Sequence, residues 1–219
     1  KLDDPLIPTT EKTEALARAR RYFKLAQSYF TQPEKPQLII TTGLVATGKT
    51  VLAQALARRL GATLISSDPL RKELAGIPHQ EHRFEEFGRG IYSRQFTQKT
   101  YQEMLHRARK LLAQGRWVIL DATFGKREQR EKSRELAQSA GAEFLTIETT
   151  VPEGLIRDRL EQRLRAGTVS DARWETYVAE KADFEPVGEV HPSQYIRLDT
   201  SAPLEKLAAK VVSKLEGIS

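Results

Sequence analysis

The chain has 219 residues, no cysteine and a formal net charge of +6 at pH 7. This length suits one α/β domain with a complete core and an additional element at one end. The lack of cysteine excludes disulfides, thiolate catalysis and zinc–thiolate sites, and the four histidines are scattered. No apolar run approaches the roughly 20 residues that cross a bilayer, so we expect no membrane partner.

Residues 1–36 differ in pattern from the rest of the chain. Apolar positions predict a helix over residues 11–30, and the proline-bearing stretch 32–36 predicts a linker. Because residue 1 is Lys rather than Met, we expect the chain to be part of a longer protein. We therefore separate an N-terminal helix and linker, residues 1–36, from a main domain, residues 37–219.

Strand and helix patterns alternate from residue 37 onward. Strand patterns cover residues 37–42, 62–66, 117–120, 143–149 and 194–198. Helix patterns cover residues 51–60, a segment starting at 69, and residues 92–114, 126–140, 152–166, 174–183 and 204–215. This alternation predicts an α/β fold: a parallel five-stranded sheet with helices on both faces and the ligand at the carboxyl ends of the strands.

Residues 43–50 satisfy the pattern G-x-x-x-x-G-K-[ST] between a strand and a helix. In that context the peptide N–H groups wrap phosphates, Lys49 reaches the outer phosphates and the Thr50 hydroxyl holds Mg²⁺. We therefore expect ATP and Mg²⁺, with GTP left open, and a cytoplasmic location. The predicted nucleotide-binding residues are Gly43, Leu44, Val45, Ala46, Thr47, Gly48, Lys49, Thr50 and Val51.

Polar residues follow the next two strand patterns. Asp68 is the candidate general base for an acceptor hydroxyl, on a strand expected beside the loop, or else the N-cap of the helix that starts at residue 69. Arg71 is a candidate for binding an acceptor phosphate or carboxylate, or else a surface arginine. Asp121 is placed to hold Mg²⁺ or orient Thr50, or else it is a turn aspartate. Thr123 is a weaker candidate for contacting the acceptor.

The helix pattern 152–166 is rich in arginine. Arg159 and Arg163 lie four residues apart beside an apolar stripe, and a turn-prone stretch follows at 167–171. This arrangement predicts a small helical lid whose arginines neutralise charge in a transition state and exclude water. The alternative is a solvated face on which the arginines pair with Asp158 and Glu161.

These segments resemble small P-loop kinases of the zeta-toxin, gluconate-kinase and polynucleotide-kinase type over residues 37–213. Residues 43–50, 66–76, 118–124 and 170–172 are similar to the ATP-binding kinase module that follows an aminoglycoside-phosphotransferase-like domain in some bacterial proteins. The resemblance implies a P-loop NTPase three-layer sandwich, with residues 1–36 as the tail or linker of an upstream domain. Asp68 and Arg71 fit the D-x-x-R motif of polynucleotide 5′-kinases, whereas Ala46 and Thr47 depart from the usual glycine or serine pair.

The sequence thus predicts an ATP-dependent kinase that phosphorylates a hydroxyl of a small molecule. Ala122 supports transfer over hydrolysis, because it stands where hydrolysing ATPases often carry a water-activating glutamate. Two alternatives stay open. One is a polynucleotide 5′-hydroxyl kinase, since a basic balance permits a nucleic-acid partner. The other is a non-catalytic nucleotide-sensing module that regulates an attached domain.

Overall fold

The computed structural model describes residues 13, 14, 16, 35–78, 88–166 and 174–217, with the backbone alone for 163–166. The chain divides into two units, residues 1–34 and 35–219. In the first unit Thr13, Glu14 and Leu16 are helical, and the rest of the helix predicted over 11–30 lies outside the described residues. The second unit contains the sheet and the phosphate loop.

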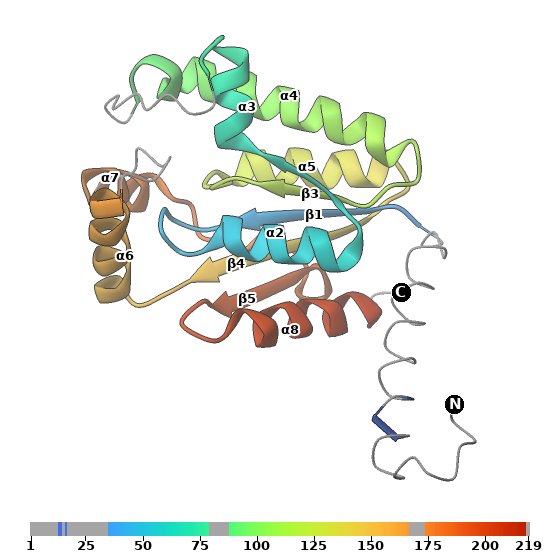
Figure 1. Ribbon diagram of the computed structural model, residues 1–219. Helices are drawn as coiled ribbons and strands as arrows, with labels where there is room; N and C mark the ends of the chain where they lie inside the picture. Colours follow the sequence, from blue (N-terminus) through green and yellow to red (C-terminus); the bar gives the residue numbers. More distant parts are fainter. Residues whose placement is uncertain (1–12, 15, 17–34, 79–87, 167–173, 218–219) are drawn as a thin grey trace. The chain divides into compact units, whose positions relative to one another are not determined.

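Within the described residues, five parallel strands form one sheet in the order β2-β3-β1-β4-β5 (Figure 1). The strands are β1 (Gln37–Thr42), β2 (Thr63–Ser66), β3 (Val118–Asp121), β4 (Glu143–Thr150) and β5 (Tyr195–Asp199). The predicted fold class is confirmed. The expectation that β2 lies beside β1 is wrong, because β3 pairs with both of them and separates them.

The central strand β1 is buried over its whole length, and its side chains alternate between two cores. Leu38 and Ile40 face the core formed with α3, α4 and α5, whereas Ile39 faces the core formed with α2 and α8. The sheet is therefore the middle layer of three. The helices are α2 (Lys49–Leu60), α3 (Ser67–Leu74), α4 (Arg94–Leu112), α5 (Arg127–Ser139), α6 (Glu153–Ala166), α7 (Trp174–Asp183) and α8 (Leu204–Glu216).

Two short 3₁₀ turns, η1 (Gly90–Tyr92) and η2 (Pro192–Gln194), precede α4 and β5. One predicted boundary is corrected by the structure. Helix α3 begins at Ser67 with Ser66 as its N-cap, so Asp68 lies in the first helical turn and is not the cap. Among the described residues, no helix combines the length and apolar character needed to span a membrane.

Helices α6 and α7 stand at the edge toward which the strands point (Figure 1). Ile156 and Leu160 of α6 and Tyr177 of α7 form a small apolar cluster with Ala46, which lies in the loop after β1. The predicted lid helix is thus packed on the phosphate loop through its apolar stripe. The turn-prone stretch at 167–171 lies outside the described residues.

A buried ion pair fixes the segment between α7 and β5. The Arg130 guanidinium on α5 is fully buried and donates to Glu189 over 2.5 Å from Nε and 3.1 Å from Nη2. Its Nη1 group also donates to the Phe124 carbonyl oxygen at 2.9 Å. Removing one partner of such a pair leaves an uncompensated buried charge.

We expect Glu189→Ala to lower the free energy of unfolding by about 3 kcal/mol, because the Arg130 charge stays buried without its partner. The matched control is Glu131→Ala. Glu131 pairs with Arg127 at 2.8 Å on the exposed side of α5, so its loss should cost under about 1 kcal/mol. Urea denaturation of both variants measures the difference. Equal losses would show that burial of the Arg130 pair has no special energetic weight.

Candidate functional site

The backbone of the loop between β1 and α2 adopts positive φ angles at two glycines. Gly43 has φ +132°, and a Cβ atom there would lie 2.4 Å from the Thr149 carbonyl oxygen on β4. Gly48 has φ +85° and is the N-cap of α2. Ala46 also adopts a left-handed φ of 61°, a conformation that favours glycine. The loop therefore accommodates its unusual residue at position 46 with a strained but allowed alanine.

The loop carbonyl groups are bonded within the protein. The Leu44 carbonyl oxygen accepts from Lys49 Nζ and from Thr47 Oγ1, each at 2.7 Å. The Thr47 carbonyl oxygen accepts from the Thr200 hydroxyl at 2.8 Å, beyond the end of β5. Thr47 Oγ1 also lies 2.7 Å from Thr149 Oγ1. At Thr47 a hydroxyl thus ties the loop to β4.

Arg159 of α6 is bound to the loop and to Thr200. Its Nη1 group donates to the Ala46 carbonyl oxygen and to Thr200 Oγ1, both at 3.1 Å, and Nη2 donates to the Thr200 carbonyl oxygen at 2.9 Å. Arg157 stacks instead on the Trp174 ring at 4.4 Å. The side chain of Arg163 lies outside the described residues, so its catalytic role stays a prediction.

Asp121 lies at the carboxyl end of β3, between the loop strand β1 and β2. Its side chain is buried and accepts a hydrogen bond from Thr41 Oγ1 at 3.2 Å. Thr50, at the start of α2, is exposed. Both offer the hard oxygen donors that Mg²⁺ prefers, and Mg²⁺ commonly binds through one or two carboxylates and the substrate phosphates. In the described part of the chain there is no group of three or more acidic, His or Cys side chains that could hold a metal ion.

Asp68 projects from the first turn of α3, at the carboxyl end of β2. Its Oδ1 atom accepts a hydrogen bond from the Tyr92 hydroxyl at 3.3 Å. Tyr92 belongs to η1, so this turn orients the carboxylate. Strands lie about 4.8 Å apart, and β2 is two positions from β1, which places Asp68's strand roughly 10 Å from the loop strand.

Arg71 lies on α3, three residues after Asp68, and is buried. Its Nη1 group donates to the Ile91 carbonyl oxygen at 2.6 Å and to Thr97 Oγ1 at 3.0 Å, and its guanidinium carbon lies 5.0 Å from the centre of the Tyr92 ring. Burial lowers the pKa of Arg71, and nearby Tyr101, Tyr92 and Asp68 oppose that shift. These contacts hold η1 and Tyr92 in place. Binding of an acceptor by Arg71 stays a prediction.

Glu180 of α7 is a site residue that the sequence reasoning missed. Its Oε2 atom accepts a hydrogen bond from the Val45 amide of the loop at 2.8 Å. Burial raises the pKa of Glu180, while Lys49, the Val45 N–H and the Thr123 hydroxyl act in the opposite direction. Contact of Thr123 with an acceptor stays a prediction. Glu180 sits in an ordinary amphipathic helix pattern, so no motif spacing marks it.

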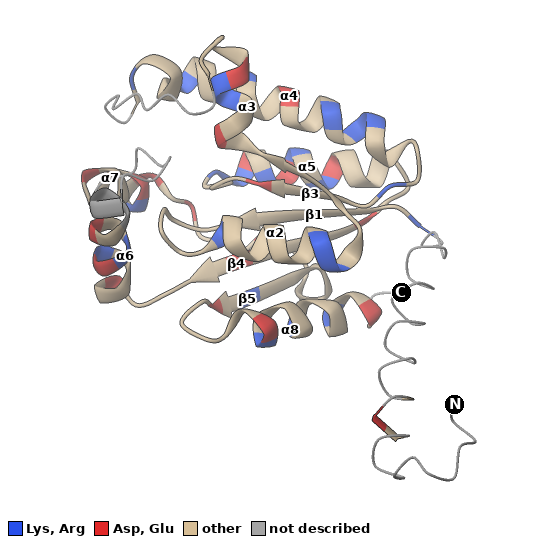
Figure 2. Ribbon diagram, in the orientation of Figure 1, with Lys and Arg blue, Asp and Glu red and all other residues tan. Residues whose placement is uncertain are grey.

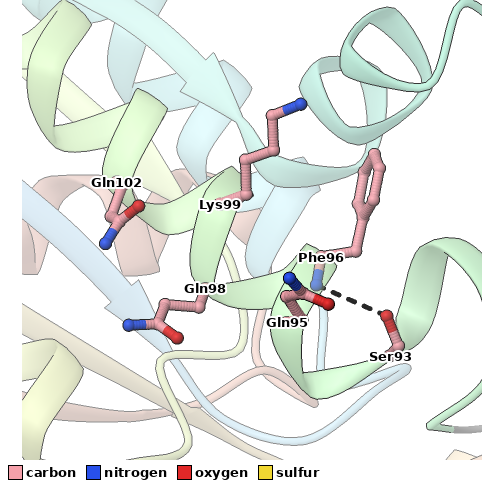
Figure 3. A pocket seen from close by; sticks show the side chains of 6 residues that line it. All are labelled: Ser93, Gln95, Phe96, Gln98, Lys99 and Gln102. Carbon is pink, nitrogen blue, oxygen red and sulfur yellow. Dashed lines mark hydrogen bonds between the residues drawn. The ribbon is translucent and has the colours of Figure 1, made fainter.

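A surface hollow runs along the first two turns of α4 (Figure 3). Its lining combines polar side chains with one aromatic ring and comes from α4 and its N-cap: Ser93, Gln95, Phe96, Gln98, Lys99 and Gln102. The Ser93 hydroxyl accepts a hydrogen bond from the Phe96 amide and caps the helix. The residues that line this hollow include none from the phosphate loop, so it is distinct from the site at the strand ends.

We expect Arg159→Ala to weaken binding of Mg-ATP by about tenfold, because the Ala46 carbonyl loses the bond that holds the loop in shape. Arg157→Ala removes the same side chain type from the exposed side of α6 and should leave the affinity unchanged. Isothermal titration calorimetry of both variants makes the comparison. Equal affinities for the two variants would contradict a supporting role for Arg159.

The AAA domain family matches residues 38–187 of the chain. Uncharacterized proteins of Mycobacterium tuberculosis and Mycobacterium bovis are 33% identical to it over 200 residues, a match that covers 89% of this chain. The chain spans 38% of the length of those relatives.

Two solved structures show the same fold. A gluconokinase from Sinorhizobium meliloti has a TM-score of 0.59 and 21% identity, covering 85% of this chain and 95% of that one. An APS kinase from Mycobacterium tuberculosis, solved with AMPPNP and APS, has a TM-score of 0.59 and 22% identity, covering 84% and 99%. The expected P-loop kinase fold is confirmed, and the chain belongs to the AAA domain family.

Proposed function

We propose that this domain is an ATP-dependent kinase that transfers the γ-phosphoryl group to a hydroxyl of a small molecule. The observation that carries the proposal is the order of three neighbouring strand ends. The loop with Lys49 follows β1, Asp121 ends β3, and Asp68 follows β2. The candidates for phosphate binding, magnesium binding and general base catalysis thus follow one another along one sheet edge, which supports the proposal.

The loop would bind the nucleotide. Its peptide N–H groups and the N-terminus of α2 favour the phosphates, and Lys49 would exchange its bond to the Leu44 carbonyl for the β- and γ-phosphates. Thr50 and Asp121 would hold Mg²⁺, which when bound neutralises charge on the phosphate oxygens. Thr41 keeps the Asp121 carboxylate in place through its hydroxyl bond. Positioning and charge stabilisation are the main requirements of phosphoryl transfer.

Asp68 would act on the acceptor. Its carboxylate accepts the proton of the acceptor hydroxyl as the acceptor oxygen bonds to the γ-phosphorus, and the bond from that phosphorus to the bridging oxygen breaks to release ADP. The Tyr92 hydroxyl fixes one carboxylate oxygen, which leaves the orientation of the other defined. Asp68 and the loop follow strands that lie two positions apart in the sheet, with β3 between them.

The structures of similar fold bear the names gluconokinase and APS kinase, which supports a small-molecule acceptor here. A polynucleotide acceptor has less support. The D-x-x-R motif would use Arg71 to bind an acceptor phosphate. In this structure its guanidinium donates instead to the Ile91 carbonyl oxygen and to Thr97 Oγ1. Charges of both signs are interspersed on α5 and α6, while α2 and α4 carry mainly basic ones (Figure 2); a nucleic-acid track needs basic groups clustered on one face.

One observation favours a sensing role as second candidate. The chain spans only 38% of its curated relatives, so nucleotide binding here can act on an attached region. The predicted neighbour, an aminoglycoside-phosphotransferase-like domain, remains a prediction. In that case Asp68 would have only a structural role, through its bond to Tyr92. Its loss would leave the function of the assembly unchanged.

We expect Asp68→Asn to reduce phosphoryl transfer about 100-fold or more, because the amide cannot accept the hydroxyl proton, while Mg-ATP affinity is retained. Asp158→Asn, on the exposed side of α6, is the matched control and should transfer at the wild-type rate. Labelled ATP with sugars, aminoglycosides and 5′-hydroxyl oligonucleotides as acceptors provides the assay. Transfer that survives Asp68→Asn would remove the general base from the proposal, and transfer to oligonucleotides alone would establish the polynucleotide alternative.

A further inference from the structure

The Glu180 carboxylate occupies the place that a phosphate group requires. It accepts the Val45 N–H at 2.8 Å, and Lys49 and the Thr123 hydroxyl act to lower its pKa. A loop amide, a hydroxyl and an ammonium group are also the donors that a phosphate oxygen uses in such loops. We propose that Glu180 is an internal competitor for the phosphate site, which a nucleotide must displace in order to bind.

The competition follows from charge. A phosphate oxygen bound to the Val45 amide and to Lys49 would face a carboxylate of the same sign in the same small space, and the two repel strongly in a partly desolvated site. Burial raises the pKa of Glu180, and Lys49 and the Val45 N–H oppose that shift and favour the carboxylate. Once a phosphate takes those donors, nothing in this network offsets the burial of the Glu180 charge.

Helix α7 has other anchors, so Glu180 can leave without loss of the helix. Glu153 of α6 accepts hydrogen bonds from the Tyr177 hydroxyl at 3.0 Å and from Lys181 Nζ at 2.6 Å. Asp183, at the end of α7, pairs with Lys126 at 2.7 Å. The bond from Val45 to Glu180 is therefore one of several contacts that hold α7. It differs from the others because the Glu180 carboxylate occupies the proposed phosphate site.

The inference rests on the proposed nucleotide binding and adds a residue that sets its affinity. If Glu180 fills the loop for most of the time, nucleotide can bind only in the remaining fraction. The apparent affinity then equals the affinity of the open loop multiplied by that fraction. Neutralising Glu180 removes the repulsion, and shortening it removes the contact. Both changes should therefore tighten the binding of phosphate-bearing ligands, with adenosine unaffected because it has no phosphate.

The test compares Glu180→Gln, Glu180→Ala and wild-type protein, using the chain as it exists, by calorimetric titration with Mg-ATP and with adenosine. We expect both variants to bind Mg-ATP about tenfold more tightly, with adenosine affinity unchanged. Glu175→Gln is the matched control, because it removes a negative charge from an exposed position in the first turn of α7 and should change the affinity less than about twofold.

Equal or weaker Mg-ATP binding by both variants, with wild-type binding intact, would overturn the inference and leave the kinase proposal standing. An equal gain in Glu175→Gln would also overturn it, because the effect would then be general charge. Tighter binding without phosphorylation of any acceptor would support the inference and count against the kinase. If wild type and variants all fail to bind Mg-ATP, nucleotide binding and the inference fall together.

Discussion

The hydrogen bonds made by the carbonyl groups of the phosphate loop are the constraint on which the rest of the site depends. The Leu44, Ala46 and Thr47 carbonyl oxygens accept from Thr47 Oγ1, Arg159 and Thr200 respectively. A peptide unit whose carbonyl is fixed has its N–H direction fixed as well, because the unit is planar. The loop can therefore present amides to an anion only while these partners, drawn from the loop itself, α6 and the turn after β5, remain in place.

The sheet order gives the site its second constraint. Because β3 separates β1 from β2, Asp121 lies between the loop and Asp68 along the edge. Two carboxylates at one anionic ligand would repel it unless a cation intervenes. A magnesium ion at Asp121 and Thr50 would stand between them and the phosphates, so the strand order that the structure shows suits the proposed chemistry better than the adjacency expected from sequence.

The parts of the site that sequence predicts are those fixed by local chemistry. Gly43, Gly48 and Lys49 follow from backbone conformation and spacing, and the strands follow from continuous apolar runs. The order of the strands does not, because alternating strands and helices fit several parallel arrangements. Side-chain partners far apart in the chain are the other gap. The bond from Arg71 to the Ile91 carbonyl oxygen joins residues 20 positions apart and directs the guanidinium toward η1. The hydrogen bond between the Val45 amide and Glu180 joins residues 135 positions apart, and no motif near Glu180 in the sequence predicts it.

Helices α6 and α7 contribute opposite charges to the same loop. Arg159 of α6 binds a carbonyl oxygen, a group that an incoming phosphate does not seek, so its bond is compatible with an occupied loop. Glu180 of α7 binds an amide, which is a group that a phosphate does seek. On the proposed competition, nucleotide binding leaves the α6 contact intact and breaks the α7 contact, so α6 acts as the fixed support of the loop. Any conformational response to the nucleotide then arises in α7, and the Arg130–Glu189 pair holds the segment that follows this helix.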